Sequence, residues 1–273
     1  MFTVFIAADI EGTTGYVDWP ERPPEDEWFR KQMTAEVNAA IEGALAGGAD
    51  DFIVSDIHWK KQNIIPDLLS GRARLIRGTR RRLMWMDMVD RCNLVFLIGF
   101  HAGCGAAGAV LPHTITTRIT GLRINGRHSN EALISAFTAG HYRVPVGLAS
   151  GDKSFIDEVL AFLPELETVA VKEGIGNCAA LNIHPAQALE NIKEAAEKAA
   201  RRGIKGCFNP LICDEPAEII MEVSWPGYAE ALSLIPGVHR LGGREVSYKG
   251  KWLEVMNILS LFVNYVPSLP VLS

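Results

Sequence analysis

The sequence predicts an α/β fold, with a mostly parallel central sheet flanked by helices and a smaller α+β part toward the C-terminus. Short β-branched apolar runs alternate with longer amphipathic stretches through the first half, which is the pattern of repeated βαβ units. The run at 94–100 is apolar on both faces, as in a strand buried within a parallel sheet. No low-complexity linker divides the chain, so we expect a soft boundary between a first domain at 1–165 and a second at 166–273.

The elements of the first half follow from periodicity and from turn residues. Gly47 and Gly48 end the first amphipathic stretch as a glycine C-cap. Asn125 and Gly126 readily take the positive φ angles of a tight hairpin, which predicts a turn after the strand at 118–124. The other expected strands are 3–8, 51–55, 94–100 and 144–149, and the expected helices are 27–46, 83–91, 130–139 and 153–162.

The second half is less regular and contains one strongly predicted helix, at 185–202. Pro185 suits its first turn, alanines fill its interior, and Arg201 and Arg202 favour its C-terminal end before Gly203. Strands are expected at 168–171 and 218–223, and helices at 228–234 and 254–265.

Composition excludes several classes of protein. The chain has 273 residues, of which 48% are hydrophobic and 22% charged, so it is neither disordered nor fibrous. With 27 Lys+Arg and 32 Asp+Glu, the net charge of −5 argues against a nucleic-acid partner. The arginine-rich stretch at 72–82 has no interleaved aromatics for base stacking. We expect it to be a solvated or subunit-interface face or, near a pocket, to favour substrates that carry a carboxylate.

The compartment is predicted from both ends and from the cysteines. The N-terminal apolar stretch has no basic leader and soon meets Asp9, unlike a signal peptide. The apolar segment at 255–272 is interrupted by asparagines and prolines, so we expect no membrane span. Five cysteines without a CxxC pair are typical of reduced cytosolic thiols. These features predict a cytoplasmic protein.

Candidate ligands follow three expected strands. The first strand leads to Asp9 and Glu11, the second to Asp56 and His58, and the third directly to His101. Residues i and i+2 of an extended chain point to the same side. Because the carboxyl ends of parallel strands share one edge of a sheet, these carboxylates and imidazoles are expected to gather there.

This mixture of side chains suits a transition metal. Carboxylate oxygens together with imidazole nitrogens match Zn2+ or Mn2+ better than Ca2+ or Mg2+. A two-metal site needs a bridging carboxylate, which Asp9 could supply, and Glu131 is a further candidate donor. Taken singly, each residue has a structural alternative, since an Asp at a strand end often caps a helix and a His is often only hydrogen-bonded.

These residues lie within six short segments of the sequence. The segments are DIEGTTGYV at 9–17, TAEVNAA at 34–40, SDIH at 55–58, GFHA at 99–102, PHT at 112–114 and NGRHSNEA at 125–132. In order and spacing they resemble a known family, the M55 zinc-dependent D-aminopeptidases. The resemblance runs from the first strand to the last helix and is strongest over the first 152 residues. Ile57, Pro112 and Asn130 depart from the family pattern as we interpret it.

The resemblance implies a two-zinc site and an active-site histidine. His113 falls on the position of that histidine, and Asp9 on the bridging ligand. Two Zn2+ per subunit are implied, with Mn2+ or Co2+ as substitutes. The implied partners are a short peptide substrate and further copies of the chain in a homo-oligomer, a decamer of stacked rings. The implied metal ligands are Asp9, Glu11, His58, His101 and Glu131.

The implied activity is that of a zinc-dependent aminopeptidase, which removes the N-terminal residue of short peptides by attack of a metal-bound hydroxide. Peptides with an N-terminal D-amino acid are the expected substrates, although the residues themselves do not decide between D and L. His113 could carry a proton to the leaving amine, stabilise the oxyanion or act as a nucleophile. The alternatives are another dinuclear metallohydrolase, an amidase or phosphoesterase, and a non-catalytic, metal-stabilised peptide-binding protein.

Further residues have open roles. Glu11 or Asp56 could meet the substrate's α-amino group, and Asp56 could instead orient a ligand imidazole. Lys172 could meet a substrate carboxylate or pair with a surface acid. Exposed tryptophans and the apolar tail from residue 266 could form subunit contacts, or could be buried within one chain. The tryptophans in question are Trp19, Trp28 and Trp59.

Overall fold

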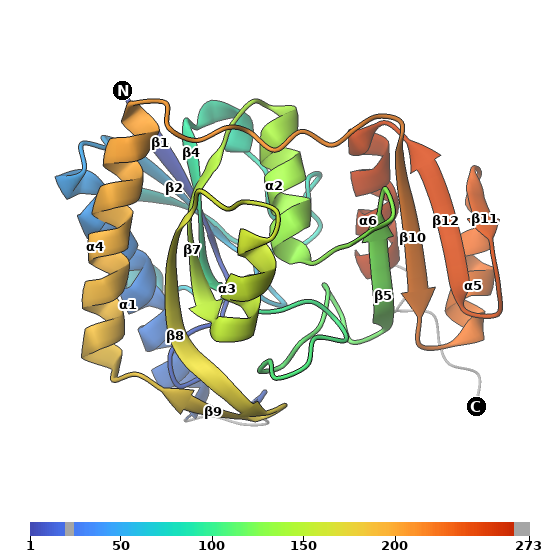
Figure 1. Cartoon of the computed structure of the whole chain (residues 1–273), viewed down its shortest axis with the longest axis horizontal. Coiled ribbons are helices and arrows are strands. Elements are labelled where there is room, and N and C mark those ends of the chain that lie inside the picture. Colours follow the sequence, from blue (N-terminus) through green and yellow to red (C-terminus); the bar gives the residue numbers. More distant parts are fainter. Residues whose placement is uncertain (20–24, 265–273) are drawn as a thin grey trace.

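A seven-stranded sheet forms the centre of the computed structural model, which describes residues 1–19 and 25–264 (Figure 1). Its strand order is β3-β2-β1-β4-β7-β8-β9, and all neighbouring pairs are parallel except the last. The predicted fold class is confirmed. The strands are β1 (Thr3–Ala8), β2 (Asp51–Asp56), β3 (Ala73–Ile76), β4 (Leu94–Phe100), β7 (Val146–Asp152), β8 (Glu167–Gly176) and β9 (Ala179–Asn182).

Two pairs of helices cover the two faces of this sheet. α1 (Glu25–Ala46) and α4 (Pro185–Ile204) lie side by side on one face, and α2 (Glu131–His141) and α3 (Lys153–Leu160) lie on the other (Figure 1). The alanine-rich stripe of α4 is buried against α1 and the sheet, and its small side chains let the two helices pack closely. β1 and β4 are buried along their whole length, as their sequences predict.

A second, antiparallel sheet of five strands lies beyond α2 in Figure 1, in the order β11-β12-β10-β5-β6. The helices α5 (Pro226–Ser233) and α6 (Trp252–Asn264) pack with it. The indole of Trp252 on α6 donates a 3.1 Å hydrogen bond to Thr138 Oγ1 on α2, which ties the two layers together. The strands are β5 (Ile119–Ile124), β6 (Arg127–His128), β10 (Ala217–Val223), β11 (Val238–Arg240) and β12 (Glu245–Gly250).

The two sheets do not divide the chain at residue 165. The strands β5 and β6 come from the first half of the chain and pair with β10 from the second half. Conversely, β8, β9 and α4 come from the second half and complete the central sheet and its helical cover. The chain therefore crosses between the sheets more than once.

Most expected elements are present, and one expected helix is wrong. Residues 83–91 form turns and a short 3-10 helix at Val89–Arg91, because Met84 and Met88 take left-handed backbone angles (φ of 61° and 73°) that an α-helix cannot contain. The hairpin at Asn125 and Gly126 is confirmed, with φ of 48° and 76°. The strands β3, β9, β11 and β12 were not predicted. Residue 265, expected to end the last helix, lies outside the described residues.

The order of the strands creates a switch point at β1. The chain proceeds from β1 to β2 and β3 on one side and then returns to place β4 on the other side of β1. In open parallel sheets, ligands bind at the carboxyl ends of the strands at such a point. The ends of β1, β2 and β4 lie there together.

In the two described stretches of the chain, no helix combines the length and apolar character that crossing a membrane requires.

The contact between α1 and α4 depends on a glycine. A Cβ at Gly43 would overlap the backbone carbonyl of Lys193 on α4. We predict that Gly43→Ala lowers the free energy of unfolding by about 2 kcal/mol, although alanine is the better helix former by about 1 kcal/mol. Chemical denaturation measures the change. The matched control is Gly71→Ala, where a Cβ meets nothing within 4 Å and stability should change by less than about 0.5 kcal/mol. Equal effects of the two substitutions would contradict this account of the packing.

Candidate metal centre

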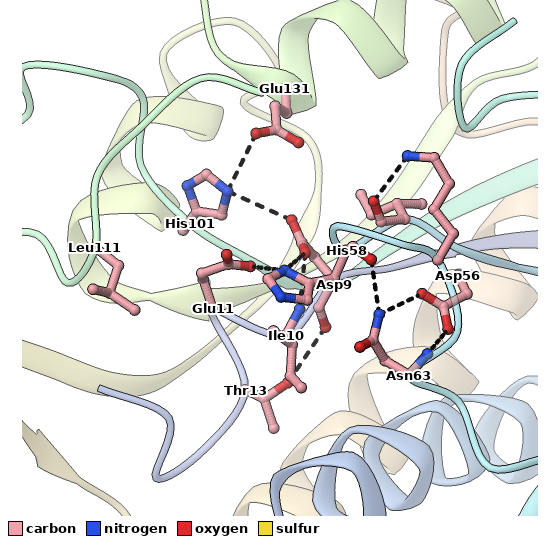
Figure 2. A network of polar contacts seen from close by, with 12 residues as sticks. Asp9, Ile10, Glu11, Thr13, Asp56, His58, Asn63, His101, Leu111 and Glu131 are labelled. Carbon is pink, nitrogen blue, oxygen red and sulfur yellow. Dashed lines mark hydrogen bonds and ion pairs between the residues drawn. The ribbon is translucent and has the colours of Figure 1, made fainter. Parts of the chain in front are cut away.

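All six residues singled out in the sequence meet at the carboxyl edge of the central sheet. Asp9 and Glu11 follow β1, and the other members come from the loops after β2 and β4 and from the start of α2. Figure 2 shows the carboxylates of Asp9, Glu11 and Glu131 and the imidazoles of His58 and His101 gathered in one place. The structure thus brings together Asp9, Glu11, His58, His101, His113 and Glu131.

Local backbone features place these side chains. A Cβ at Gly12 would overlap the carbonyl of Phe100, so only glycine lets the turn after Glu11 lie directly on the end of β4. The same turn is fixed by a 2.8 Å hydrogen bond from the Gly12 amide to the Gly99 carbonyl. Asn130 caps α2, accepting a 2.9 Å hydrogen bond from the Leu133 amide, and so holds Glu131 at the first turn of this helix.

The carboxylate of Asp9 lies between two imidazoles (Figure 2). Its Oδ1 is 3.5 Å from Nδ1 of His58, and its Oδ2 is 3.5 Å from Nε2 of His101. Each imidazole has a second carboxylate neighbour: Glu11 Oε2 is 2.9 Å from His58 Nδ1, and Glu131 Oε1 is 3.4 Å from His101 Nε2. Asp9 therefore joins two clusters of donors, one on each side of its carboxylate.

The imidazole of His101 is placed so that it could bind a metal ion. Its Nδ1 lies 3.0 Å from the carbonyl oxygen of Ala102, to which it donates, and this leaves the lone pair of neutral His101 on Nε2. In the described part of the chain, this buried Nε2 makes no hydrogen bond. Donor atoms bound to one tetrahedral zinc lie about 3.3 Å apart when the bonds are about 2.0 Å. The separations of 3.4 and 3.5 Å from His101 to its two carboxylates fit such an ion.

Electrostatics favour positive charge at this site. Burial and the neighbouring Glu11 raise the pKa of Asp9. Burial also opposes ionisation of Glu11, but the charge of His58 prevails and holds the pKa of Glu11 well below its usual range. Burial lowers the pKa of His58, but the charges of its two carboxylate neighbours outweigh burial and raise this pKa to about 10. The pKa of His101 is raised in the same way, because its carboxylate neighbours also outweigh burial. Buried carboxylates that raise the pKa of nearby imidazoles also create a negative potential, which favours the binding of cations.

His113 lies at the rim of the same cluster. Its Nδ1 is 2.9 Å from the Leu111 carbonyl, so Nε2 is directed inward, where it lies 3.9 Å from both Glu11 Oε1 and Glu131 Oε1. Its ring stacks on His101, with centroids 4.0 Å apart. Donor atoms converge within 4.8 Å in two sets, His101 with His113 and Glu131, and His101 with Asp9 and Glu11. The geometry therefore suits His113 either for proton transfer or as a donor.

Two residues near the centre have roles that the sequence did not predict. Asp56 is fully buried, and its carboxylate accepts hydrogen bonds from the side chain of Asn63 (2.9 Å) and the Ile64 amide (2.8 Å). It thus fixes the loop that carries His58, rather than facing a substrate amine or a ligand imidazole. The indole of Trp19 donates a 2.9 Å hydrogen bond to Glu11 Oε1. No local pattern indicates this contact.

Lys172 on β8 holds the loop that follows β1. Its buried ammonium group donates to the backbone carbonyls of Glu11 (2.5 Å), Thr13 (2.9 Å) and Tyr16. Within the described residues its partners are these three carbonyl oxygens, rather than the substrate carboxylate or surface acid considered from the sequence. Burial lowers the pKa of Lys172 to about 8, although the charge of Glu36 acts in the opposite direction. In the sequence, Lys172 directly continues the apolar run at 168–171, and this is a signal of a buried role.

A cavity of about 290 Å³ opens beside the centre. It reaches Glu131, and Ile57, Ile115 and Trp85 form part of its wall. Another cavity, of about 310 Å³, lies near Asn130 and the start of β6, and none of the six residues lines it. The first cavity is therefore the better place for a substrate.

Three comparisons relate the chain to known proteins. A family model described as Peptidase M55, D-aminopeptidase, matches residues 2–261. A D-aminopeptidase of Bacillus subtilis (strain 168) is 28% identical over 255 residues, which are 91% of each chain. The solved structure of the zinc-dependent D-aminopeptidase DppA from Bacillus subtilis, described as a self-compartmentalizing protease, superposes with a TM-score of 0.90 at 24% identity and covers 98% of both chains.

Removal of the Lys172 ammonium should destabilise the protein. Lys172→Met leaves three buried carbonyl oxygens without their donor, and each such loss costs about 1 kcal/mol or more. We predict a fall of at least about 3 kcal/mol in the free energy of unfolding, measured by chemical denaturation. The control is Lys193→Met, which breaks only an exposed ion pair with Glu42 and should cost less than about 1 kcal/mol. A loss no larger than that of the control would show that the buried lysine does not stabilise the loop.

Proposed function

The chain belongs to the M55 family of D-aminopeptidases, and we propose that it is a zinc-dependent enzyme that removes an N-terminal D-amino acid from short peptides. The observation that carries the proposal is the carboxylate of Asp9, placed between two imidazoles that each have a second carboxylate neighbour. Such a doubled set of oxygen and nitrogen donors is what a hydrolase with two metal ions requires.

The donors divide into two sets that would hold two Zn2+ per chain, with Mn2+ or Co2+ as substitutes. One set is His58 and Glu11 with Oδ1 of Asp9, and the other is His101 and Glu131 with Oδ2 of Asp9. When bound, the ions supply Lewis acidity for the scissile carbonyl and make water a nucleophile at neutral pH. The buried Nε2 of His101, which faces two carboxylates but makes no hydrogen bond within the described residues, supports this assignment.

His113 is the residue that we propose to carry the proton. Because its Nδ1 is fixed on the Leu111 carbonyl, its Nε2 is the nitrogen that can exchange a proton with the reacting groups. The protonated imidazole donates to the leaving amine, which would otherwise depart as an unstable anion. The edge-on indole of Trp19, 5.6 Å from the imidazole between ring centroids, and the stacked His101 hold the ring in place. An acid–base role needs no covalent step, so we prefer it to nucleophilic attack.

The carboxylate of Glu11 is our candidate for recognising the substrate's α-amino group. Its Oε1, which accepts the hydrogen bond from Trp19, lies within the cluster 3.9 Å from His113 Nε2, whereas the oxygens of Asp56 bind the loop after β2, away from the cluster. An ammonium group near Glu11 would be stabilised by the charge that the low pKa of this carboxyl maintains.

We further propose a cytoplasmic homo-oligomer, a decamer in the form that the family resemblance implies. The self-compartmentalizing character of the DppA structure supports assembly in this chain. Trp28 and Trp59 are 46% and 75% exposed, which makes them candidates for subunit contacts. The apolar tail from residue 266 lies outside the described residues.

Substrate specificity tests the proposal. Matched D- and L-aminoacyl amides, incubated with the zinc-loaded protein, should show at least a tenfold preference for the D form. A chelator should abolish the activity and added Zn2+ should restore it. Faster hydrolysis of the L form would contradict the stereochemical assignment. Turnover of a phosphate ester without peptide hydrolysis would indicate a different metallohydrolase, and release of unchanged peptide would indicate a binding protein.

Variants separate metal binding from proton transfer. We predict that His101→Ala and Glu131→Ala each reduce the zinc content of the purified protein, because each removes a donor from the same set. His113→Ala should retain its zinc and lose about 10²–10⁴-fold in kcat. The control is His128→Ala, which changes an exposed histidine on β6 and should leave both zinc content and kcat unchanged. Wild-type turnover by His113→Ala would remove this residue from the mechanism.

A further inference from the structure

The cavity beside the candidate centre is lined by more cations than anions. Glu131 is the one acidic residue among the described residues that line it, and it already faces His101 and the Ile115 amide. Four cationic residues contribute to the wall, which is unusual next to a site rich in carboxylates. They are Lys61, Arg80, Arg81 and Arg118.

The ammonium group of Lys61 can donate more hydrogen bonds than it does in the structure. Its Nζ donates a 3.1 Å hydrogen bond to the Ile57 carbonyl and lies 5.8 Å from the centre of the Trp85 ring. Within the described residues, no carboxylate lies within ion-pair distance of this Nζ. An ammonium group has three hydrogens, so Lys61 can donate further hydrogen bonds to a ligand.

Arg81 and Arg118 also form no ion pair with a carboxylate in the described part of the chain, although Asp87 and Asp56 act on the charge of Arg81 from a greater distance. Arg81 is held rigidly, with Nη1 2.9 Å from Ser55 Oγ and Nη2 2.6 Å from the Asp56 carbonyl, both neutral acceptors. The guanidinium of Arg118 lies 5.7 Å from the centre of the Tyr228 ring. These contacts orient the two guanidinium groups without cancelling their charge.

The cations are close enough to repel one another. Lys61 and Arg81 line the same cavity, and the charge of Arg81 acts against that of Lys61. Carboxylates at a greater distance offset only part of this repulsion, since neither cation has a direct ion pair within the described residues. Partly buried cations without a direct ion-pair partner raise the free energy of the folded protein. An incoming carboxylate would relieve this repulsion and would form charge-assisted hydrogen bonds with the cations.

We propose that this cavity binds a carboxylate on the leaving side of the scissile bond, so that the preferred substrates are short peptides with an anionic second residue. The inference rests on the proposed function, since it places the leaving group beyond Glu131. In a dipeptide, the α-carboxylate and the scissile nitrogen belong to the same residue and are joined through its Cα, so a carboxylate held in a cavity that opens at Glu131 lies on the leaving side of the bond. The free C-terminus of a dipeptide and an acidic side chain offer the same chemistry.

Paired substrates distinguish these two sources. The dipeptide D-Ala-Gly is compared with its C-terminal amide, and D-Ala-Asp amide is compared with D-Ala-Asn amide. We expect at least a tenfold higher kcat/KM for the anionic member of one pair. A preference within the first pair identifies the α-carboxylate, and one within the second identifies a side-chain carboxylate. Equal kcat/KM within both pairs overturns the proposal while leaving the proposed activity intact.

Variants of the cavity assign the preference to its cations. Lys61→Met and Arg118→Met should each lower kcat/KM for the anionic substrate by about tenfold and change that for the neutral partner by less than twofold. The control is Arg82→Met, since Arg82 is exposed and does not line the cavity. An equal loss for both members of a pair would indicate a structural role and overturn the assignment.

A binding measurement covers the case in which no peptide is hydrolysed, which would contradict the proposed function. N-acetylglycine and N-acetylglycinamide are titrated into the full chain, and tryptophan fluorescence is recorded because Trp59 and Trp85 line the cavity. The inference predicts saturable quenching by the carboxylate only, weakened at least tenfold in Lys61→Met. Equal responses to the acid and the amide, or none to either, overturn the inference.

Discussion

The arrangement of the whole site depends on burying three carboxylates at one edge of the central sheet. The strand order places the ends of β1, β2 and β4 side by side, and it brings Asp9 and Glu11 against Glu131 across the imidazoles. Ionised carboxylates removed from water are costly unless cations face them. The raised pKa values of His58 and His101 show how strongly this edge attracts positive charge. Two divalent ions would meet that demand, which is why the same constraint leads to metal chemistry.

The loops that carry these residues are fixed by groups that do not themselves join the cluster. Lys172 holds the backbone after β1, and Asp56 holds the loop after β2. Gly12 allows the loop after β1 to lie on the end of β4. Because each support comes from neighbouring structure, the orientation of the donors does not depend only on the contacts that they make with one another. The adjacent cavity is lined by cations, whose charge is opposite to that of the buried carboxylates. A zwitterionic peptide would match both regions.

How far the sequence predicts this structure depends on the range of the interactions involved. Buried strands and their end residues follow from local periodicity, so the sequence alone predicts that the donors after β1, β2 and β4 lie together. The helix expected at 83–91 failed because Met84 and Met88 take left-handed angles, which their sequence does not indicate. The contact of Lys172 with the Glu11 carbonyl joins residues 161 positions apart, and no local pattern contains it. The crossing of β5 and β6 into the second sheet is equally non-local.

The central claim is that Asp9 joins two metal sites within one chain. Its most direct test is the zinc content of the full-length protein, reconstituted with excess Zn2+, dialysed and measured by elemental analysis against protein concentration. The account predicts two zinc ions per chain, because the two oxygens of Asp9 each face a separate pair of donors. One zinc per chain in a fully active protein would contradict it.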